Sequence, residues 1–148
     1  MEKKNLYNQA VLDEILTRLA KIESNSTPDW GKMTAAQMLA HCAEVQEVTN
    51  GKALKNTPFM VKVFKGLIKA AVISDKSYPK GSKTHPQYIQ KEDKDFNQEK
   101  NRLVEALNKF HQNPEAKVEH PLFGAMTHEE KGWAMYKHLD HHLNQFGV

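Results

Sequence analysis

The sequence predicts an all-α protein, a four-helix bundle with one additional helix. Apolar residues recur at three- and four-residue spacings along five segments, and typical helix start and stop signals bound these segments. We find no convincing strand pattern and no internal repeat. The chain has 148 residues, of which 39% are hydrophobic, so it is long enough to bury a full core as a single domain over residues 1–148.

The first two helices are expected at about residues 6–22 and 34–49. Apolar side chains line one face of the first segment: Leu12, Ile15, Leu16, Leu19 and Ile22. The second segment begins with a capping box, in which the Thr34 hydroxyl accepts from the first turn while the Gln37 side chain reaches back to the Thr34 amide. Asn50 and Gly51 are typical of a helix end, so they stop this helix.

A third helix is expected at about residues 58–74, because Pro58 suits a first helical position. One face is apolar, with Phe64, Leu67, Ile68, Ala71 and Val72, and another carries Lys62, Lys65 and Lys69. Such a basic amphipathic helix can bind an anionic membrane surface. A bundle helix with a solvated lysine face is the simpler interpretation. Residues 75–91 then form a loop of unusual length, which is typical of a functional lid or a mobile segment.

The last two helices are expected at about residues 92–111 and 127–146. The fourth ends at Asn113 and Pro114, and the last begins with a second capping box formed by Thr127 and Glu130. Four long helices, a shorter one and a long loop together indicate a bundle with a long crossover connection.

Composition excludes several classes of protein. The net charge is only +3, and two of the 21 basic residues are arginines, so we expect no nucleic-acid partner. Cys42 is the only cysteine, which excludes a disulfide scaffold and favours a reducing, cytoplasmic location. No apolar run resembles a signal peptide or is long enough to span a bilayer. Together with a place in the bundle for the apolar face of residues 58–74, this leads us to expect no membrane partner.

Histidines carry the strongest functional signal, because five of the eight lie in the last 29 residues. His138 and His142 lie four residues apart on one margin of the last helix, a spacing that lets two imidazoles bind one ion. His41 falls on the apolar face of the second helix and should point inward. Taken alone, His41 is more simply a core histidine with satisfied ring nitrogens. Together, the three residues suggest a metal site.

Three imidazoles would leave coordination positions open to water or substrate, as in catalytic metal sites. Zn²⁺, Ni²⁺ and Fe²⁺ all accept such ligands, and residue spacing does not choose among them. His141 is a candidate fourth ligand, a proton shuttle or an exposed bystander. Gln145 lies near His138 around the helix, so it is a candidate to support a ligand or to touch substrate.

Other reactive side chains have simpler explanations. Cys42 lies near the centre of the apolar face of the second helix, so it is better explained as a small buried hydrophobe than as a nucleophile. Glu44, one turn after His41, is a weak candidate for a general base. His120 precedes Pro121, which favours a loop beside the last helix, where it would line the pocket or simply pack. The sequence therefore predicts no clear catalytic residue outside the metal site.

Three separated motifs resemble a bacterial family of unknown function within the DinB-like (DinB/YfiT) superfamily of metalloenzymes. They are WGKMTAAQMLAHC at residues 30–42, HPLFG at residues 120–124 and YKHLDHHLNQF at residues 136–146. The resemblance implies an up-down-down-up bundle, usually dimeric, with a divalent metal held by His41, His138 and His142. Better-understood relatives transfer low-molecular-weight thiols or isomerise thiol adducts.

Two functions remain open at this stage. The first is a divalent-metal-dependent enzyme, a thiol transferase or a hydrolase that acts on a small molecule such as a low-molecular-weight thiol. The absence of a clearly placed carboxylate base mildly favours thiol activation over hydrolysis. The alternative is a non-enzymatic helical-bundle protein, a binding or stress-related protein with a vestigial metal site.

Overall fold

The structure, a computed structural model, describes residues 1–115 and 119–148. These residues form six α-helices and one short 3₁₀ helix and contain no β-strand, which confirms the predicted all-α class. The helices are α1 (Gln9–Ala20), α2 (Ala35–Thr49), α3 (Phe59–Val63), α4 (Lys65–Ile73), η1 (Pro86–Tyr88), α5 (Phe96–Gln112) and α6 (His128–Gln145).

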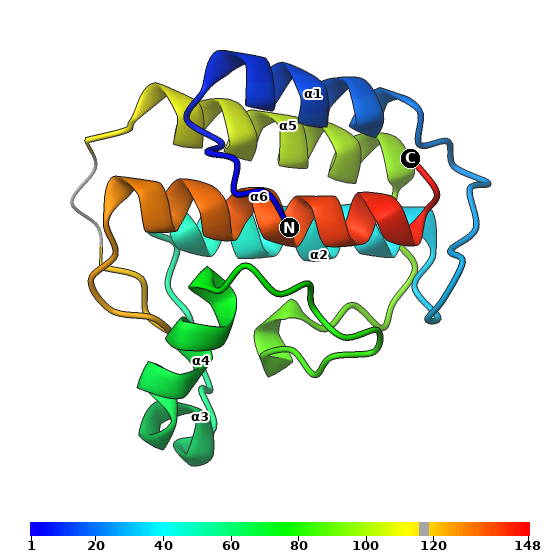
Figure 1. Ribbon diagram of the computed structural model, residues 1–148. Coiled ribbons are helices and arrows are strands. Elements are labelled where there is room, and N and C mark those ends of the chain that lie inside the picture. The colour runs from blue at the N-terminus through cyan, green and yellow to red at the C-terminus, as the bar shows by residue number, and fades with distance from the viewer. Residues whose placement is uncertain (116–118) are drawn as a thin grey trace.

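Helices α1, α2, α5 and α6 make the bundle (Figure 1). α1 and α6 run in one direction, and α2 and α5 run in the opposite direction, so the topology is up-down-down-up. α2 packs most extensively on α5 and also contacts α6. Because parallel neighbours such as α2 and α5 cannot be joined by a tight turn, the chain between them is long, and it carries α3, α4 and η1 along one side of the bundle.

Both expected capping boxes are present. The Thr34 hydroxyl accepts from the Gln37 amide at 3.1 Å and the Thr34 amide donates to Gln37 Oε1 at 3.0 Å. Thr127 and Glu130 make the same reciprocal pair at the start of α6. A cap of this kind stabilises a helix by about 1 kcal/mol. It also fixes where the helix begins, and therefore which residues of α2 and α6 face each other.

The core is continuous across the four long helices, and α2 lies at its centre. Thirteen of the fifteen residues of α2 are buried. The same core cluster contains apolar residues from the other three bundle helices: Leu12, Ile15 and Leu19 of α1, Leu103, Leu107 and Phe110 of α5, and Met135, Leu139 and Leu143 of α6. A helix that is buried nearly all round can place a polar side chain in a dry interior, and α2 does this with His41.

The expectation of one bundle helix over residues 58–74 is wrong. The segment forms two short helices that meet at Phe64, whose backbone (φ −93°, ψ 18°) is not helical. Neither helix contains a buried residue. Without burial on the bundle, tertiary packing does not hold a long helix straight, and Gly66 lowers its intrinsic propensity. We call residues 59–73 the α3–α4 arm.

Two smaller boundaries also differ from expectation. α5 begins at Phe96 rather than near residue 92, because the Asp95 side chain caps it by accepting from the Gln98 amide at 2.7 Å. The expected loop at residues 75–91 contains η1, which His85 caps. Within the described ranges, no helix has the length and apolar character needed to cross a membrane.

Candidate metal centre

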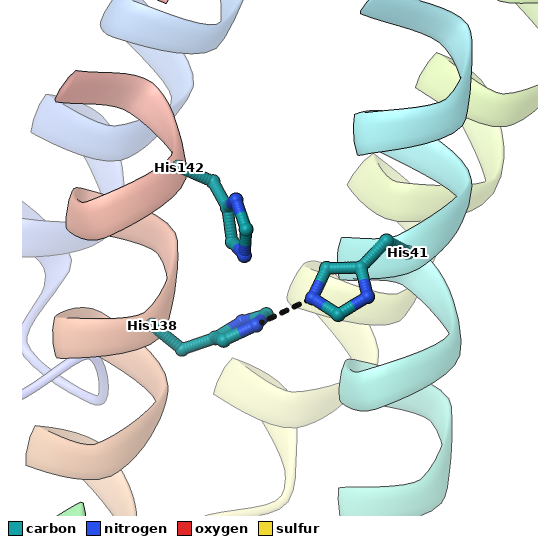
Figure 2. A group of neighbouring side chains, drawn as sticks. All are labelled: His41, His138 and His142. Atoms are coloured by element: carbon teal, nitrogen blue, oxygen red, sulfur yellow. Dashed lines mark hydrogen bonds between the residues drawn. The ribbon is translucent and has the colours of Figure 1, made fainter. Parts of the chain in front are cut away.

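Three histidines from two helices converge in the bundle interior. His41 projects from α2 toward His138 and His142, which lie one turn apart on α6 (Figure 2). One ring nitrogen from each lies within 4.8 Å of the other two. The Nε2 atoms of His41 and His138 are 3.0 Å apart. The structure therefore brings together the three residues that the sequence suggested as ligands, in a group that could hold a metal ion.

A backbone carbonyl orients His41. Its Nδ1 lies 2.9 Å from the Tyr88 carbonyl oxygen in η1. Because a carbonyl only accepts, Nδ1 carries the proton and Nε2 keeps its lone pair directed at the cluster. Sequence reasoning missed Tyr88, since its contribution is a main-chain oxygen that any residue type would supply.

A side-chain amide orients His142 in the same way. His142 Nδ1 donates to Gln145 Oε1 at 2.9 Å, and Gln145 Nε2 donates to the Trp30 carbonyl oxygen at 2.7 Å. The second bond fixes which end of the amide faces His142. Gly31 makes room for this contact, because a Cβ there would lie 2.7 Å from Gln145 Nε2. Two of the three imidazoles thus direct an Nε2 lone pair at the shared space, and that of His41 accepts from His138 Nε2.

Burial keeps the three imidazoles neutral. It lowers the pKa of His142 to about 3, helped by the nearby His41 ring and opposed by the hydrogen bond to Gln145. It also lowers the pKa of His41, against the effect of the Tyr88 carbonyl, and it holds the pKa of His138 well below the ordinary value. Neutral imidazole is the form that binds a metal, so the site is in its ligand form at physiological pH.

His141 lies on the rim of the centre, and the structure does not bring it into the three-histidine group. Its ring meets the edges of His142, Trp30 and Tyr78, with centroids 5.1–5.9 Å apart. It also lines a cavity of about 180 Å³ with Trp30, Tyr78 and Lys80. His141 therefore lines this cavity and also contacts the candidate ligand His142.

A family model described as "Protein of unknown function (DUF1569)" matches residues 1–147. The chain belongs to the DUF1569 family. No curated protein and no solved structure matches it. For this DUF1569 protein, the remaining evidence on function comes from the side chains around the centre.

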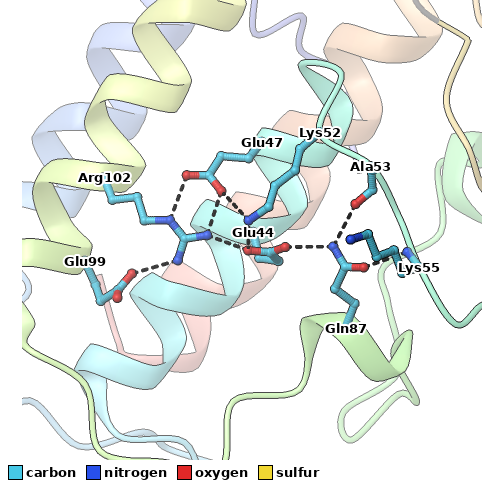
Figure 3. A network of polar contacts seen from close by, with 8 residues as sticks. All are labelled: Glu44, Glu47, Lys52, Ala53, Lys55, Gln87, Glu99 and Arg102. Atoms are coloured by element: carbon cyan, nitrogen blue, oxygen red, sulfur yellow. Dashed lines mark hydrogen bonds and ion pairs between the residues drawn. The ribbon is translucent and has the colours of Figure 1, made fainter.

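In this DUF1569 chain, Glu44 belongs to a polar network that joins α2 to α5 and to both ends of the α2–α5 connection (Figure 3). It accepts from Lys52, Gln87 and Arg102. Burial raises the pKa of Glu44, but these three contacts outweigh it and the pKa is lowered. The carboxylate is therefore held as an anion. Its partner Gln87 precedes Tyr88, so Glu44 helps to place the carbonyl that orients His41.

His120 and Cys42 lie outside the group of candidate ligands. His120 is buried, stacks on Phe123 at 4.2 Å and accepts from the Leu122 amide, and burial lowers its pKa to about 4. Cys42 is also buried, next to Met38, and burial raises the pKa of its thiol. A buried thiol with a raised pKa is a poor nucleophile, so the structure favours a packing role for Cys42.

Proposed function

We propose that this protein is a divalent-metal-dependent enzyme that acts on a small molecule, with His41, His138 and His142 as the metal ligands. The observation that carries the proposal is the convergence of three neutral imidazoles from two helices. Two of them are held by hydrogen bonds at Nδ1, which is how metal-binding histidines are commonly oriented.

The spacing of the donor atoms fits one shared ion. Two nitrogens bound at about 2.1 Å to one ion lie about 3.0 Å apart when the bonds are at right angles. The Nε2 atoms of His41 and His138 have this separation, 3.0 Å. Three neutral imidazoles suit Zn²⁺, Ni²⁺ or Fe²⁺, and they leave coordination positions for other ligands.

The surroundings of the centre favour a thiol substrate. A divalent ion in such a site deprotonates a coordinated thiol or lowers the pKa of a coordinated water. Hydrolysis also calls for a base, and Glu44, the candidate nearest in sequence to His41, is already bound by Lys52 and Arg102. Thiol transfer does not need that base. We therefore favour a thiol transferase over a hydrolase.

The substrate site that we propose is the cavity beside His141. Its volume of about 180 Å³ suits part of a small molecule. Trp30 and Tyr78 supply flat apolar walls, and the Lys80 ammonium lies 4.4 Å from the centre of the Trp30 ring. A low-molecular-weight thiol that carries a negatively charged group fits these walls.

Membership of the DinB-like superfamily is part of the proposal. The three motifs, the up-down-down-up bundle and the position of one histidine on α2 and two on α6 support it. With that membership we propose a homodimer that works in the cytoplasm without a nucleic-acid partner. The single, buried, reduced Cys42 is in keeping with that location.

Elemental analysis of untagged protein, purified without chelators, tests the metal. We expect about one divalent ion per chain, and we expect His41→Ala, His138→Ala and His142→Ala each to lose it. His128→Ala is the matched control, because His128 lies at the exposed start of α6, outside the cluster. A chain that binds no divalent ion refutes the proposal.

Activity separates the enzyme from the non-enzymatic alternative. The metal-loaded protein is incubated with low-molecular-weight thiols and an electrophilic acceptor, and free thiol is followed over time. We expect metal-dependent thiol consumption that His142→Ala abolishes. Full metal occupancy without turnover of any thiol would instead support a binding protein with a vestigial site.

A further inference from the structure

The α3–α4 arm exposes an unusual amount of apolar surface. Five large apolar side chains are between 44% and 76% exposed: Phe59, Met60, Val63, Phe64 and Leu67. Elsewhere in the described chain, only Met1 and Ile89 are comparably exposed. Neighbouring apolar side chains on an exposed element commonly mark a surface that binds a partner or a membrane.

Side chains of the bundle and a loop carbonyl hold the α4 end of the arm. Lys137 of α6 donates to the Ala71 and Ser74 carbonyl oxygens at the end of α4. Lys69 donates to the Ala125 carbonyl oxygen and pairs with Glu130. Figure 1 shows the arm directed away from the four bundle helices. These contacts anchor the α4 end of the arm to the bundle.

The segment of the chain that contains this face is strongly basic. Residues 52–83 contain eight of the 21 basic residues but one of the 18 acidic residues, so the segment carries +7 and the rest of the chain −4. Lys52 and Lys69 are paired with glutamates of the bundle. Lys62 is exposed within the arm itself, between Met60 and Phe64. The net charge of the whole chain is only +3 because the negative charge of the rest offsets the positive charge of residues 52–83.

We propose that the α3–α4 arm docks the protein on a bilayer surface that contains anionic lipids. Apolar residues that enter the interface, flanked by lysines that attract anionic headgroups, are the features of a helix that binds at a membrane surface. Two identical arms face to face would bring like charges together, which disfavours self-association through this surface. A nucleic acid would match the charge but would leave the exposed Phe59 and Leu67 without a partner.

The expectation of no membrane partner depended on burying the apolar face of residues 58–74 in the bundle. In the structure Phe64 and Leu67 of that face are exposed, while Ile68 and Val72 are half-buried. Docking through the arm is independent of the proposed metal chemistry, since the arm contributes no ligand. A failed test of the metal proposal therefore does not refute membrane docking, and a failed test of membrane docking does not refute the metal proposal.

Vesicle flotation tests the docking proposal with the full-length protein. We expect it to float with vesicles of phosphatidylcholine and phosphatidylglycerol in a 7:3 ratio (about one-third anionic lipid, enough for a strong surface potential), and not with phosphatidylcholine alone. Raising the salt concentration should weaken binding, because the lysine contribution is screened.

One double variant and one charge reversal with its matched control test the surface itself. Phe59→Ser with Leu67→Ser should weaken vesicle binding at least tenfold, while the helical circular dichroism spectrum stays unchanged because both side chains are exposed. Lys62→Glu should weaken it about fivefold or more, since each lysine near an anionic surface contributes about that factor. Lys109→Glu makes the same change of charge on the exposed side of α5 and should have little effect.

Three results would overturn the proposal. One is no flotation with anionic vesicles at low salt. Another is an equal loss in Lys109→Glu and Lys62→Glu, which would indicate attraction by overall charge alone. The third is a dimer in analytical ultracentrifugation that the Phe59→Ser, Leu67→Ser variant dissociates, since a second copy would then cover the face.

Discussion

Replacing Gln145 tests how the histidine cluster is oriented without removing a ligand. The side chain is 4% exposed and joins His142 Nδ1, at 2.9 Å, to the Trp30 carbonyl oxygen, at 2.7 Å. In Gln145→Leu both contacts are lost and the Nδ1–H of His142 is left buried without an acceptor. Losing such an outer contact lowers metal affinity by about 10–100-fold, or about 1.4–2.7 kcal/mol.

Zinc affinity is the direct measurement, by competition with a coloured chelator at neutral pH. Gln145→Glu keeps an oxygen for His142 but turns its other oxygen toward the Trp30 carbonyl oxygen. It should therefore retain zinc affinity within about threefold of the original chain, a loss of less than one hydrogen bond, while its melting temperature falls. Gln98→Leu makes the same substitution at an exposed site on α5 and serves as the control.

The reasoning is refuted if Gln145→Leu binds zinc as tightly as the unmodified chain. It is also refuted if Gln145→Glu and Gln145→Leu lose affinity equally, because the acceptor oxygen would then be irrelevant. A loss confined to the melting temperature in both variants would show that Gln145 supports the fold and not the ligand.

Three further predictions concern the contacts around the centre. Gly31→Ala should lower both zinc affinity and melting temperature, because Gly31 has φ +84° and an added Cβ would press on the Gln145 amide. Lys137→Met should lower the free energy of unfolding by about 1–3 kcal/mol, since it removes the hydrogen bonds that the Lys137 ammonium donates to the Ala71 and Ser74 carbonyl oxygens at the end of α4. Faster proteolysis within the arm would report the same loss. Arg102→Met should destabilise the chain above pH 4.5, the ordinary pKa of Glu44, and have progressively less effect below it. Contacts with Lys52, Gln87 and Arg102 hold the pKa of Glu44 low despite its burial. The stabilisation by Arg102 therefore exists while the Glu44 carboxylate is ionised and is lost as the pH falls. Urea unfolding of both chains between neutral and acid pH measures this change in the free energy of unfolding.

Local patterns in the sequence were sufficient for α2 and α6. Each has a capping box that fixes its start, and each has an apolar face whose phase fixes which histidines point inward. The four-residue spacing of His138 and His142 follows from helix geometry alone. For this reason the candidate ligands were accessible before any tertiary structure was known.

The parts that were not predicted depend on contacts between distant residues. Glu44 suggested a base because it follows His41 by one turn, but Arg102, which lies 58 residues away in sequence, binds it. The Tyr88 carbonyl that orients His41 has no signature in residue identity. The break at Phe64 arises because residues 59–73 are not buried on the bundle, and amphipathic periodicity cannot report whether a partner is present.

The long connection between α2 and α5 is fastened to the bundle at two points next to the candidate ligands, the end of α4 and η1. Lys137, which binds the end of α4, directly precedes the candidate ligand His138. Gln87 donates to the Glu44 carboxylate and accepts from the Lys55 amide. It directly precedes Tyr88, whose carbonyl orients His41. An up-down-down-up bundle needs a long crossover for topological reasons, and here that crossover also supplies part of the histidine site. Loosening the crossover at either point should therefore disturb a candidate ligand first and the four-helix core only later, because Tyr88 is the one crossover residue in the buried core cluster.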